Sequence, residues 1–293
     1  MVTPYREDGS VSLESVKRLA NYLVAGGVDG ILTCGTTGEF PVLNPEERRA
    51  IAETVFLETA GKAKLLVNIS SMNQRETAAH IRHAKELGVD GVSAVAPYYY
   101  KFDHEAMFRY FCWIAEEAGD LPVYLYNIPS NAKNSISPQL LKQLAHSCHN
   151  ICGIKDSSMD FMTYTDYQRT MGNEFTVLTG NDAQILAALQ AGGNGAVVAT
   201  ASVFPALAKG IYEDFMAGKL TEAREKQSKV YDFRNLCRSI MPGMAHKKAL
   251  ELIGFSMGPP RFPFRALDHA ETEAMRQGLE KLGLLQQHAG AFF

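Results

Sequence analysis

The stretch Ile151-Cys152-Gly153-Ile154-Lys155-Asp156 places one lysine inside a short apolar run that has the composition of a buried β-strand. Burial disfavours the charged ammonium form of a lysine, so a lysine inside such a strand tends toward the neutral amine. A neutral amine attacks carbonyl carbons, and the Schiff base that results withdraws electrons from the neighbouring carbon. The stretch therefore predicts a strand with a nucleophilic lysine; the alternative is a lysine that reaches from a strand end to solvent.

Further apolar, β-branched runs lie on both sides of this stretch, and each is followed by a helical pattern. Glycines stop the helical pattern at 26–27, 88 and 192–193, just before the next strand begins. Near-continuous apolar strands that alternate with helices predict a parallel sheet covered on both faces. The predicted strands are Ile31–Cys34, Lys64–Ser70, Val92–Ala96, Val123–Ile128, Ile151–Lys155, Phe175–Thr179 and Ala196–Thr200.

One more strand would complete a (β/α)8 barrel, and Met1–Pro4 has the composition of the last residues of a truncated first strand. No Gly-x-Gly-x-x-Gly turn follows any predicted strand, which disfavours an open, doubly wound sheet. After Thr200 helices replace strands, at Phe204–Ala217, Thr221–Ile240, Ala245–Ile253 and Ala270–Leu285. We therefore predict an α/β protein, with a (β/α)8 TIM barrel at residues 1–217 and a C-terminal helical domain at residues 218–293.

Composition narrows the classes of function. Of 293 residues, 46% are hydrophobic and the net charge is -3, so nothing in the composition favours a nucleic-acid partner. No apolar run approaches the roughly 20 residues that span a bilayer, and the N-terminus lacks the profile of a signal peptide. Scattered cysteines fit free thiols in a reducing compartment, so we expect a cytoplasmic protein that acts on a small molecule. The cysteines are Cys34, Cys112, Cys148, Cys152 and Cys237.

A cluster of possible metal ligands lies between His146 and Cys152. It falls where a helix passes into a strand, so its side chains should diverge, and no second cluster completes a zinc pattern. We therefore expect no metal at this cluster.

The loops after the carboxyl ends of barrel strands meet at one face, where active sites lie. The turn Gly35-Thr36-Thr37-Gly38-Glu39 follows one such strand, and its backbone N–H groups and hydroxyls predict a cradle for a carboxylate. Tyr126 ends the strand before that of Lys155, where a phenol could transfer protons to and from a carbinolamine. Aromatic packing of the barrel rim is the alternative for the tyrosines.

Taken together, six motifs resemble the N-acetylneuraminate lyase and dihydrodipicolinate synthase family in order and spacing. They are Gly35-Thr-Thr-Gly-Glu39, Pro97-Tyr-Tyr99, Leu125-Tyr-Asn-Ile-Pro129, Gly153-Ile-Lys-Asp156, Thr179-Gly-Asn-Asp182 and Gly192-Gly-Asn-Gly195. The resemblance covers essentially the whole chain. It implies a (β/α)8 barrel with a C-terminal helical domain, assembly into a homotetramer or dimer, and class I aldolase chemistry without a metal or cofactor.

The resemblance also implies roles for individual residues. Lys155 would form the Schiff base with pyruvate or a related 2-oxo acid, whose carboxylate would bind at Thr36 and Thr37. Tyr126 would transfer the proton, linked through the Thr36 hydroxyl to Tyr99 of a neighbouring subunit. Two residues would line the pocket beside the imine, Gly180 and Val197.

Departures from the family pattern bear on the substrate. Asn131 stands where dihydrodipicolinate synthases typically carry an arginine, so lysine synthesis is disfavoured unless Lys133 substitutes. Gly180-Asn-Asp-Ala183 replaces the Gly-Tyr-Asp-Glu that is typical of neuraminate lyases. Asp156 after the lysine is a pairing seen in members that act on 2-oxo-3-deoxy sugar acids. Candidates for contacts with substrate hydroxyls are Ser157, Asn181 and Asp182, for which capping and turn formation are the alternative.

The main prediction is therefore a lyase that cleaves a 2-oxo-3-deoxy sugar acid to pyruvate and an aldehyde. The alternatives are a 4-hydroxy-tetrahydrodipicolinate synthase, an N-acetylneuraminate lyase, a dehydratase that expels water from the same imine, and a non-catalytic barrel that binds an oxo acid.

Overall fold

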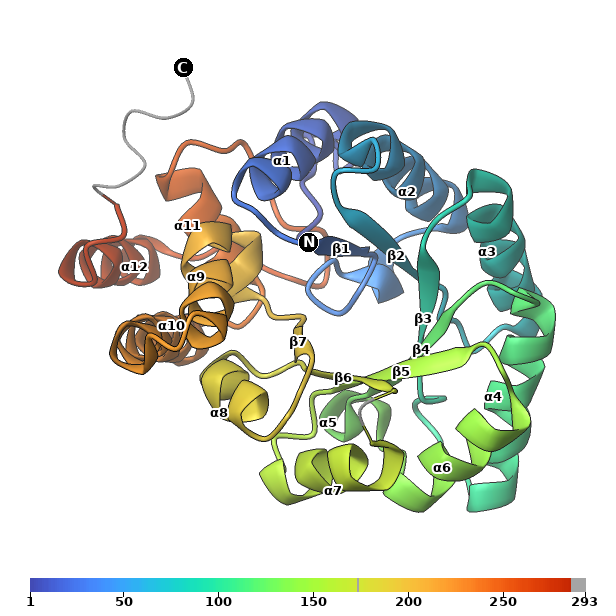
Figure 1. Ribbon diagram of the computed structural model, residues 1–293. Coiled ribbons are helices and arrows are strands. Elements are labelled where there is room, and N and C mark those ends of the chain that lie inside the picture. Colours follow the sequence, from blue (N-terminus) through green and yellow to red (C-terminus); the bar gives the residue numbers. More distant parts are fainter. Residues whose placement is uncertain (173, 286–293) are drawn as a thin grey trace. The chain divides into compact units, whose positions relative to one another are not determined.

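The computed structural model describes residues 1–172 and 174–285 (Figure 1). The chain divides into two compact units. Unit 1 consists of Met1–Ala63 and Ala199–Phe293, and unit 2 of Lys64–Val198.

Unit 2 is a parallel sheet whose strands lie side by side in sequence order, with helices between them along the chain (Figure 1). The strands are β2 (Lys64–Asn68), β3 (Gly91–Val95), β4 (Val123–Asn127), β5 (Ile151–Asp156), β6 (Thr176–Thr179) and β7 (Gly195–Ala196). The helices are α3 (Gln74–Leu87), α4 (His104–Ala118), α5 (Pro129–Ala132), α6 (Pro138–Ser147), α7 (Phe161–Met171), η2 (Asp182–Gln184) and α8 (Ile185–Gln190). The strand–helix alternation predicts this parallel order, because consecutive parallel strands need a crossover helix.

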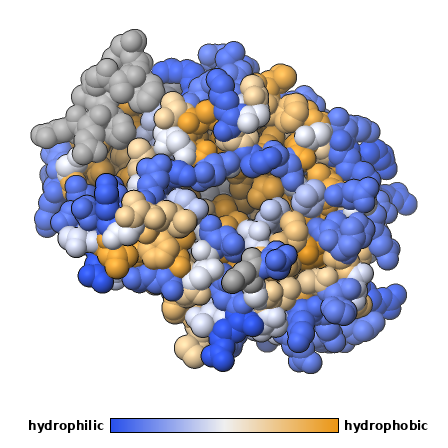
Figure 2. Space-filling view, viewed as in Figure 1, coloured by the Kyte–Doolittle hydropathy of each residue, from blue (hydrophilic) through white to orange (hydrophobic). Residues whose placement is uncertain are grey.

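The core of unit 2 lies between the sheet and its helices. Helix α4 buries Met107, Phe111 and Ile114, which recur at the spacing of one helix face, and every residue of β3 is buried. Full burial of each such side chain stabilises the fold by about 1.5–3 kcal/mol. The outward faces of α3, α4 and α6 are hydrophilic, as amphipathic helices require (Figure 2).

Strand register decides which side chains meet at the carboxyl ends of the strands. Strand β4 pairs with β5 through Val123↔Ile151 and Tyr124↔Gly153, so one residue of β5 is skipped, and the ladder continues to Tyr126↔Lys155. A Cβ atom on Gly153 would lie 2.5 Å from the ring of Tyr124, so only glycine fits at this irregularity. Without the shift, Tyr126 would pair with Ile154 instead of Lys155.

Unit 1 holds β1 (Gly30–Thr33) and the remaining helices. They are α1 (Leu13–Ala25), η1 (Phe40–Val42), α2 (Pro45–Thr59), η3 (Thr200–Ser202), α9 (Pro205–Met216), α10 (Leu220–Ile240), α11 (Met244–Leu252) and α12 (His269–Lys281). Both α2 and α12 begin with a capping box, in which Asn44 or Asp268 exchanges hydrogen bonds with the glutamate three residues later. The Tyr22 hydroxyl donates to the carbonyl of Val203 at 2.7 Å, which ties α1 to the segment that enters α9.

The predicted strands and helices are present with small shifts of their ends, except at the seventh strand and at the N-terminus. The predicted strand Ala196–Thr200 is wrong in length, because only Gly195–Ala196 pairs and the chain turns helical by Ala199 (φ -71°, ψ -35°). Met1–Pro4 contains no strand in the described structure, although the amino group of Met1 donates to the carbonyl of Leu32 on β1 at 3.0 Å. The boundary predicted after residue 217 falls between α9 and α10 and stays a prediction.

Candidate active site

Lys155 and Tyr126 lie at the carboxyl ends of neighbouring strands in unit 2. Their register pairing directs both side chains to the same face of the sheet. The Nζ atom of Lys155 lies 4.0 Å from the centroid of the Tyr126 ring, in the geometry of a cation–π contact. Tyr126 is 3% exposed, and Lys155 is half-buried between the buried residues Ile154 and Asp156. The lysine is therefore held against the ring and is still reachable by solvent.

Gly180 has no side chain, and the side chain of Lys155 lies in the space that one would fill. Its N–H donates to the carbonyl of Asp156 at 2.6 Å, which brings the start of the loop after β6 against the end of β5. A Cβ atom at this position would lie 2.8 Å from Cε of Lys155 and 1.9 Å from Oγ of Ser157. Gly180, predicted to line the pocket, and Ser157, predicted to contact substrate hydroxyls, therefore both lie close to the side chain of Lys155.

Asp156 takes part in a buried polar network. It is 3% exposed, accepts from Nδ2 of Asn127 at 2.7 Å, and accepts from the Ser158 hydroxyl at 2.8 Å. Burial raises the pKa of Asp156, and these hydrogen bonds oppose that rise. Asn127 also accepts the N–H of Ile136 at 3.0 Å, so the network fixes the ends of β4 and β5. Sequence patterns did not predict this role.

The loop after β6 contains the other predicted contacts with substrate hydroxyls. Asn181 accepts the N–H of Ala183 at 3.2 Å and caps η2. This is the capping role that was the alternative to a substrate contact. Asp182, 8% exposed, begins that short helix. Val197, half-buried, lies one residue past β7 and donates its N–H to Thr179 at 2.8 Å. Contacts of Ser157, Asp182 and Val197 with a substrate stay predictions.

In unit 1, the predicted carboxylate cradle forms a compact turn over residues 35–39. Glu39 donates its N–H to the carbonyl of Thr36 at 3.0 Å, and Phe40 donates to that of Gly35 at 3.4 Å. Thr36 is exposed and Thr37 half-buried, whereas Gly38 and Glu39 are buried. A Cβ atom on Gly38 would lie 3.0 Å from the carbonyl of Met1. The turn thus presents its threonines and buries its second half.

Glu39 was missed as a functional candidate. Its carboxylate is 4% exposed, lies 2.5 Å from Nζ of Lys247, and accepts the Tyr5 hydroxyl at 3.3 Å. One feature of the sequence indicates that Lys247 has a buried partner, because Lys247 lies on the same face of α11 as the buried residues Met244 and Leu250. A lysine on an apolar helix face requires a partner.

Tyr99 lies in the segment after β3 and is 72% exposed, with a positive φ of 77°. Its ring packs edge-on against the ring of Tyr100, with centroids 4.9 Å apart, and Tyr100 is 64% exposed. The chain therefore exposes two adjacent aromatic rings at this position.

The cysteine and histidine side chains at 146–152 do not converge on one point, because Cys148 and His149 lie against different residues. The Cys148 sulfur lies 3.3 Å from that of Cys112, and His149 lies 3.4 Å from Asp120. Within residues 1–172 and 174–285, no group of three His, Cys, Asp or Glu side chains could hold a metal ion. In the same part of the chain, no helix has both the length and the apolar character that a bilayer crossing needs.

Comparisons with known proteins extend over nearly the whole chain. The Dihydrodipicolinate synthetase family matches residues 1–282. A 4-hydroxy-tetrahydrodipicolinate synthase of Prochlorococcus marinus is 37% identical over 97% of this chain and 94% of its own length. YagE, a prophage protein of the dihydrodipicolinic acid synthase family from E. coli K12 solved in complex with pyruvate, has a TM-score of 0.93 at 29% identity and covers 97% of this chain and 96% of its own.

A sialic acid aldolase of Ruminococcus gnavus, solved as a catalytic lysine mutant, has a TM-score of 0.92 at 26% identity and covers 98% of this chain and 94% of its own. These similarities confirm the predicted (β/α)8 barrel with a C-terminal helical extension. The chain is therefore a lyase that belongs to the dihydrodipicolinate synthetase family, the class I aldolases that form a Schiff base with pyruvate.

Proposed function

We propose that the protein cleaves a 2-oxo-3-deoxy sugar acid to pyruvate and an aldehyde through a Schiff base on Lys155. The observation that carries the proposal is the contact of the Lys155 amine with the Tyr126 ring, 4.0 Å from its centroid, at the ends of adjacent strands. The absence of a side chain at Gly180 supports it, because that space beside Cε of Lys155 is needed if the side chain is to carry a substrate.

The reaction follows from the chemistry of these side chains. The neutral amine of Lys155 adds to the C2 carbonyl, and the phenol of Tyr126 protonates the carbinolamine oxygen so that water leaves. The resulting iminium accepts the electron pair of the C3–C4 bond as that bond breaks and the C4 hydroxyl loses its proton, which releases an aldehyde. Protonation of the enamine at C3 and hydrolysis then release pyruvate and free Lys155.

The turn at residues 35–39 fits the binding of the oxo acid's carboxylate. Thr36 is exposed, Thr37 is half-buried, and the backbone of the turn is already ordered by its own hydrogen bonds. We assign the substrate carboxylate to these two threonines. Tyr99 would complete the proton path from a neighbouring subunit, which its 72% exposure in one chain supports.

Substrate choice depends on the loop after β4. Asn131 is exposed and accepts the Ser130 hydroxyl at 2.9 Å, so it brings no positive charge for a second carboxylate. Lys133, also exposed, is the nearest cation along the chain. A neutral polyhydroxylated substrate tail fits this loop better than a second acidic group.

The second candidate is 4-hydroxy-tetrahydrodipicolinate synthase, favoured by the 37% identity to the relative of that name. A substrate screen separates the two. Release of pyruvate from 3-deoxy-2-oxo sugar acids, with no consumption of pyruvate when aspartate semialdehyde is added, supports the proposal. The reverse result supports the synthase, and pyruvate consumption with N-acetylmannosamine would identify a neuraminate lyase.

We also propose a cytoplasmic homotetramer or dimer. The exposed pair Tyr99 and Tyr100 supports association, and the free cysteines support a reducing compartment. Sedimentation velocity of wild type and of Tyr99→Ser/Tyr100→Ser tests the assembly, which we expect to weaken in the variant.

A further inference from the structure

A buried ion pair lies behind the turn at residues 35–39. Nζ of Lys247, on α11, lies 2.5 Å from Oε1 of Glu39, and the side chains are 5% and 4% exposed. Glu39 is the last residue of the turn and has a left-handed conformation (φ 61°, ψ 34°) that is unfavourable for a residue other than glycine. Its N–H donates to the carbonyl of Thr36. The backbone of Glu39 is therefore held in place from both the turn and the ion pair.

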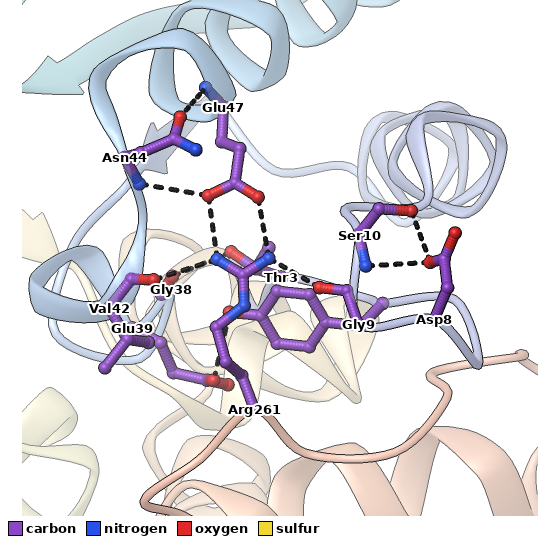
Figure 3. A network of polar contacts seen from close by, with 11 residues as sticks. Thr3, Asp8, Gly9, Ser10, Gly38, Glu39, Val42, Asn44, Glu47 and Arg261 are labelled. Atoms are coloured by element: carbon purple, nitrogen blue, oxygen red, sulfur yellow. Dashed lines mark hydrogen bonds and ion pairs between the residues drawn. The ribbon is translucent and has the colours of Figure 1, made fainter.

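Aromatic and charged groups surround this pair and hold it in position. The ring of Tyr5 lies 4.3 Å from Nζ of Lys247 and 4.5 Å from Cζ of Arg261, so it lies against both cations. Arg261 in turn bonds both carboxylate oxygens of Glu47 and the carbonyls of Val42 and Gly9 (Figure 3). The two cations balance the two carboxylates Glu39 and Glu47.

The second half of the turn has one more attachment. Thr3 donates its hydroxyl to the carbonyl of Gly38 at 2.7 Å. Because the N–H of Glu39 donates to the carbonyl of Thr36 at 3.0 Å, the position of Glu39 bears directly on that of Thr36.

We propose that Lys247 is a positioning residue, whose ammonium fixes Glu39 and thereby orders the turn that offers Thr36 and Thr37 to the substrate carboxylate. The inference rests on the proposed function, since it takes binding of that carboxylate as the task of the two threonines. It links helix α11 to substrate binding, although Lys247 itself is not assigned any contact with the reacting atoms.

Removal of Lys247 would leave the Glu39 carboxylate buried without its ion pair. A buried unpaired charge is unfavourable, so the carboxylate would turn toward water or take up a proton, and the turn would lose its left-handed end. We expect weaker binding of the oxo acid. The rate at saturation should stay close to that of wild type, because Lys155 and Tyr126 lie on β5 and β4 and not on the turn.

The test compares Lys247→Met with Lys226→Met. Lys226 pairs with Asp214 between α10 and α9, in the same unit, and so provides the same substitution at another ion pair. The measurement is the pyruvate concentration that gives half-maximal borohydride trapping on Lys155, together with the maximal trapping rate. We expect Lys247→Met to raise the half-saturating concentration about tenfold, which corresponds to roughly 1.4 kcal/mol, with a maximal rate within a fewfold of wild type.

Lys226→Met should leave both quantities unchanged, even if its thermal midpoint falls. Lys247→Arg should recover most of the affinity, because the cavity of about 430 Å³ that Lys247 lines beside Met244 and Gly258 leaves room for a guanidinium. A half-saturating concentration in Lys247→Met equal to that of wild type would overturn the proposal.

A second variant covers the case in which Lys247→Met does not fold. Glu39→Gln/Lys247→Met removes both buried charges, which is far less destabilising than leaving one unpaired. We expect it to fold and to show the same weak pyruvate binding; wild-type affinity in this folded double variant would refute the positioning role. If wild type itself is not labelled by pyruvate, the proposed function fails, and the role of Lys247 fails with it.

Discussion

The amine of Lys155 lies over the ring of Tyr126 because the β4–β5 ladder slips by one residue between Val123 and Tyr124. Gly153 permits the slip, since a side chain there would collide with the ring of Tyr124. A local irregularity near the start of two strands thus decides which pair of side chains meets at their ends. Bulges serve to redirect side chains in this way.

Tyr126→Phe should lower kcat by about 10²- to 10⁴-fold, the usual contribution of a positioned acid or base. The phenylalanine ring keeps the apolar support beneath Lys155, so borohydride trapping with pyruvate should still go to completion, only more slowly. Single-turnover kinetics with mass analysis measures both quantities.

The matched control is Tyr164→Phe, which removes a buried hydroxyl that donates to the carbonyl of Val177 at 3.3 Å, in the helix layer. Its kcat should equal that of wild type. An unchanged kcat in Tyr126→Phe would show that the phenol takes no part in proton transfer.

Gly180→Ala should abolish trapping while leaving far-UV circular dichroism unchanged. The added methyl group would lie 1.9 Å from Oγ of Ser157 and 2.8 Å from Cε of Lys155, so the lysine must leave its place. Adding Ser157→Ala removes the shorter of these clashes and should restore part of the trapping. Full trapping in the single variant would mean that the lysine does not need this space.

The glutamate of each capping box also pairs with an arginine, and the two ion pairs differ in how far their side chains are exposed. Glu47 bonds Arg261 with side chains 19% and 20% exposed, and Glu271 bonds Arg265 with side chains 21% and 57% exposed. Glu47→Gln should lower the free energy of unfolding at pH 7 by about 1.5–3 kcal/mol, the contribution of hydrogen bonds to charged groups. Glu271→Gln should lower it by less, because solvent screens that pair.

The same pair predicts a pH dependence. The hydrogen bonds from Arg261 lower the pKa of Glu47 below 4.5, so the folded state holds its proton less tightly than the unfolded state. The stabilisation is therefore complete above pH 4.5 and is lost as the pH falls through the lowered pKa. Urea unfolding between pH 7 and pH 3 should show wild type and Glu47→Gln converging; parallel curves would contradict the prediction.

Asn131→Arg tests what decides the substrate. An arginine on the exposed loop after β4 would offer a bidentate partner to a second carboxylate. We expect the variant to gain activity with aspartate semialdehyde by about tenfold or more, the value of one charged hydrogen bond, and to lose none of its pyruvate trapping. Coupled assays with both aldehyde classes measure the change, and Asn131→Gln is the neutral control.

Much of the barrel could be read from the sequence because its strands are apolar runs bounded by helix-stopping glycines. The starts of β2, β4 and β5 fall at the predicted residues, and Lys155 lies on the predicted strand. The seventh strand was predicted too long, because the chain already turns helical at Ala199, inside the predicted range, and continues into η3.

Two parts of the site could not be predicted from sequence patterns. The one-residue slip that sets Tyr126 against Lys155 depends on the fit of the Tyr124 ring against Gly153, which no periodicity records. The pair of Glu39 and Lys247 joins residues far apart in the chain, and only the fold brings them together. The hydrogen bonds that Asp156 accepts from Asn127 and Ser158 were likewise not predicted, because only the fold brings the ends of β4 and β5 together.

The most direct test of the account is borohydride reduction of the wild-type protein in the presence of pyruvate, followed by peptide mass analysis. We predict a reduced pyruvyl adduct on Lys155 and none in Lys155→Ala, with the folded state of that variant confirmed by circular dichroism. An unmodified Lys155, or an adduct on another lysine, would contradict the central claim that this amine, held against Tyr126, is the nucleophile.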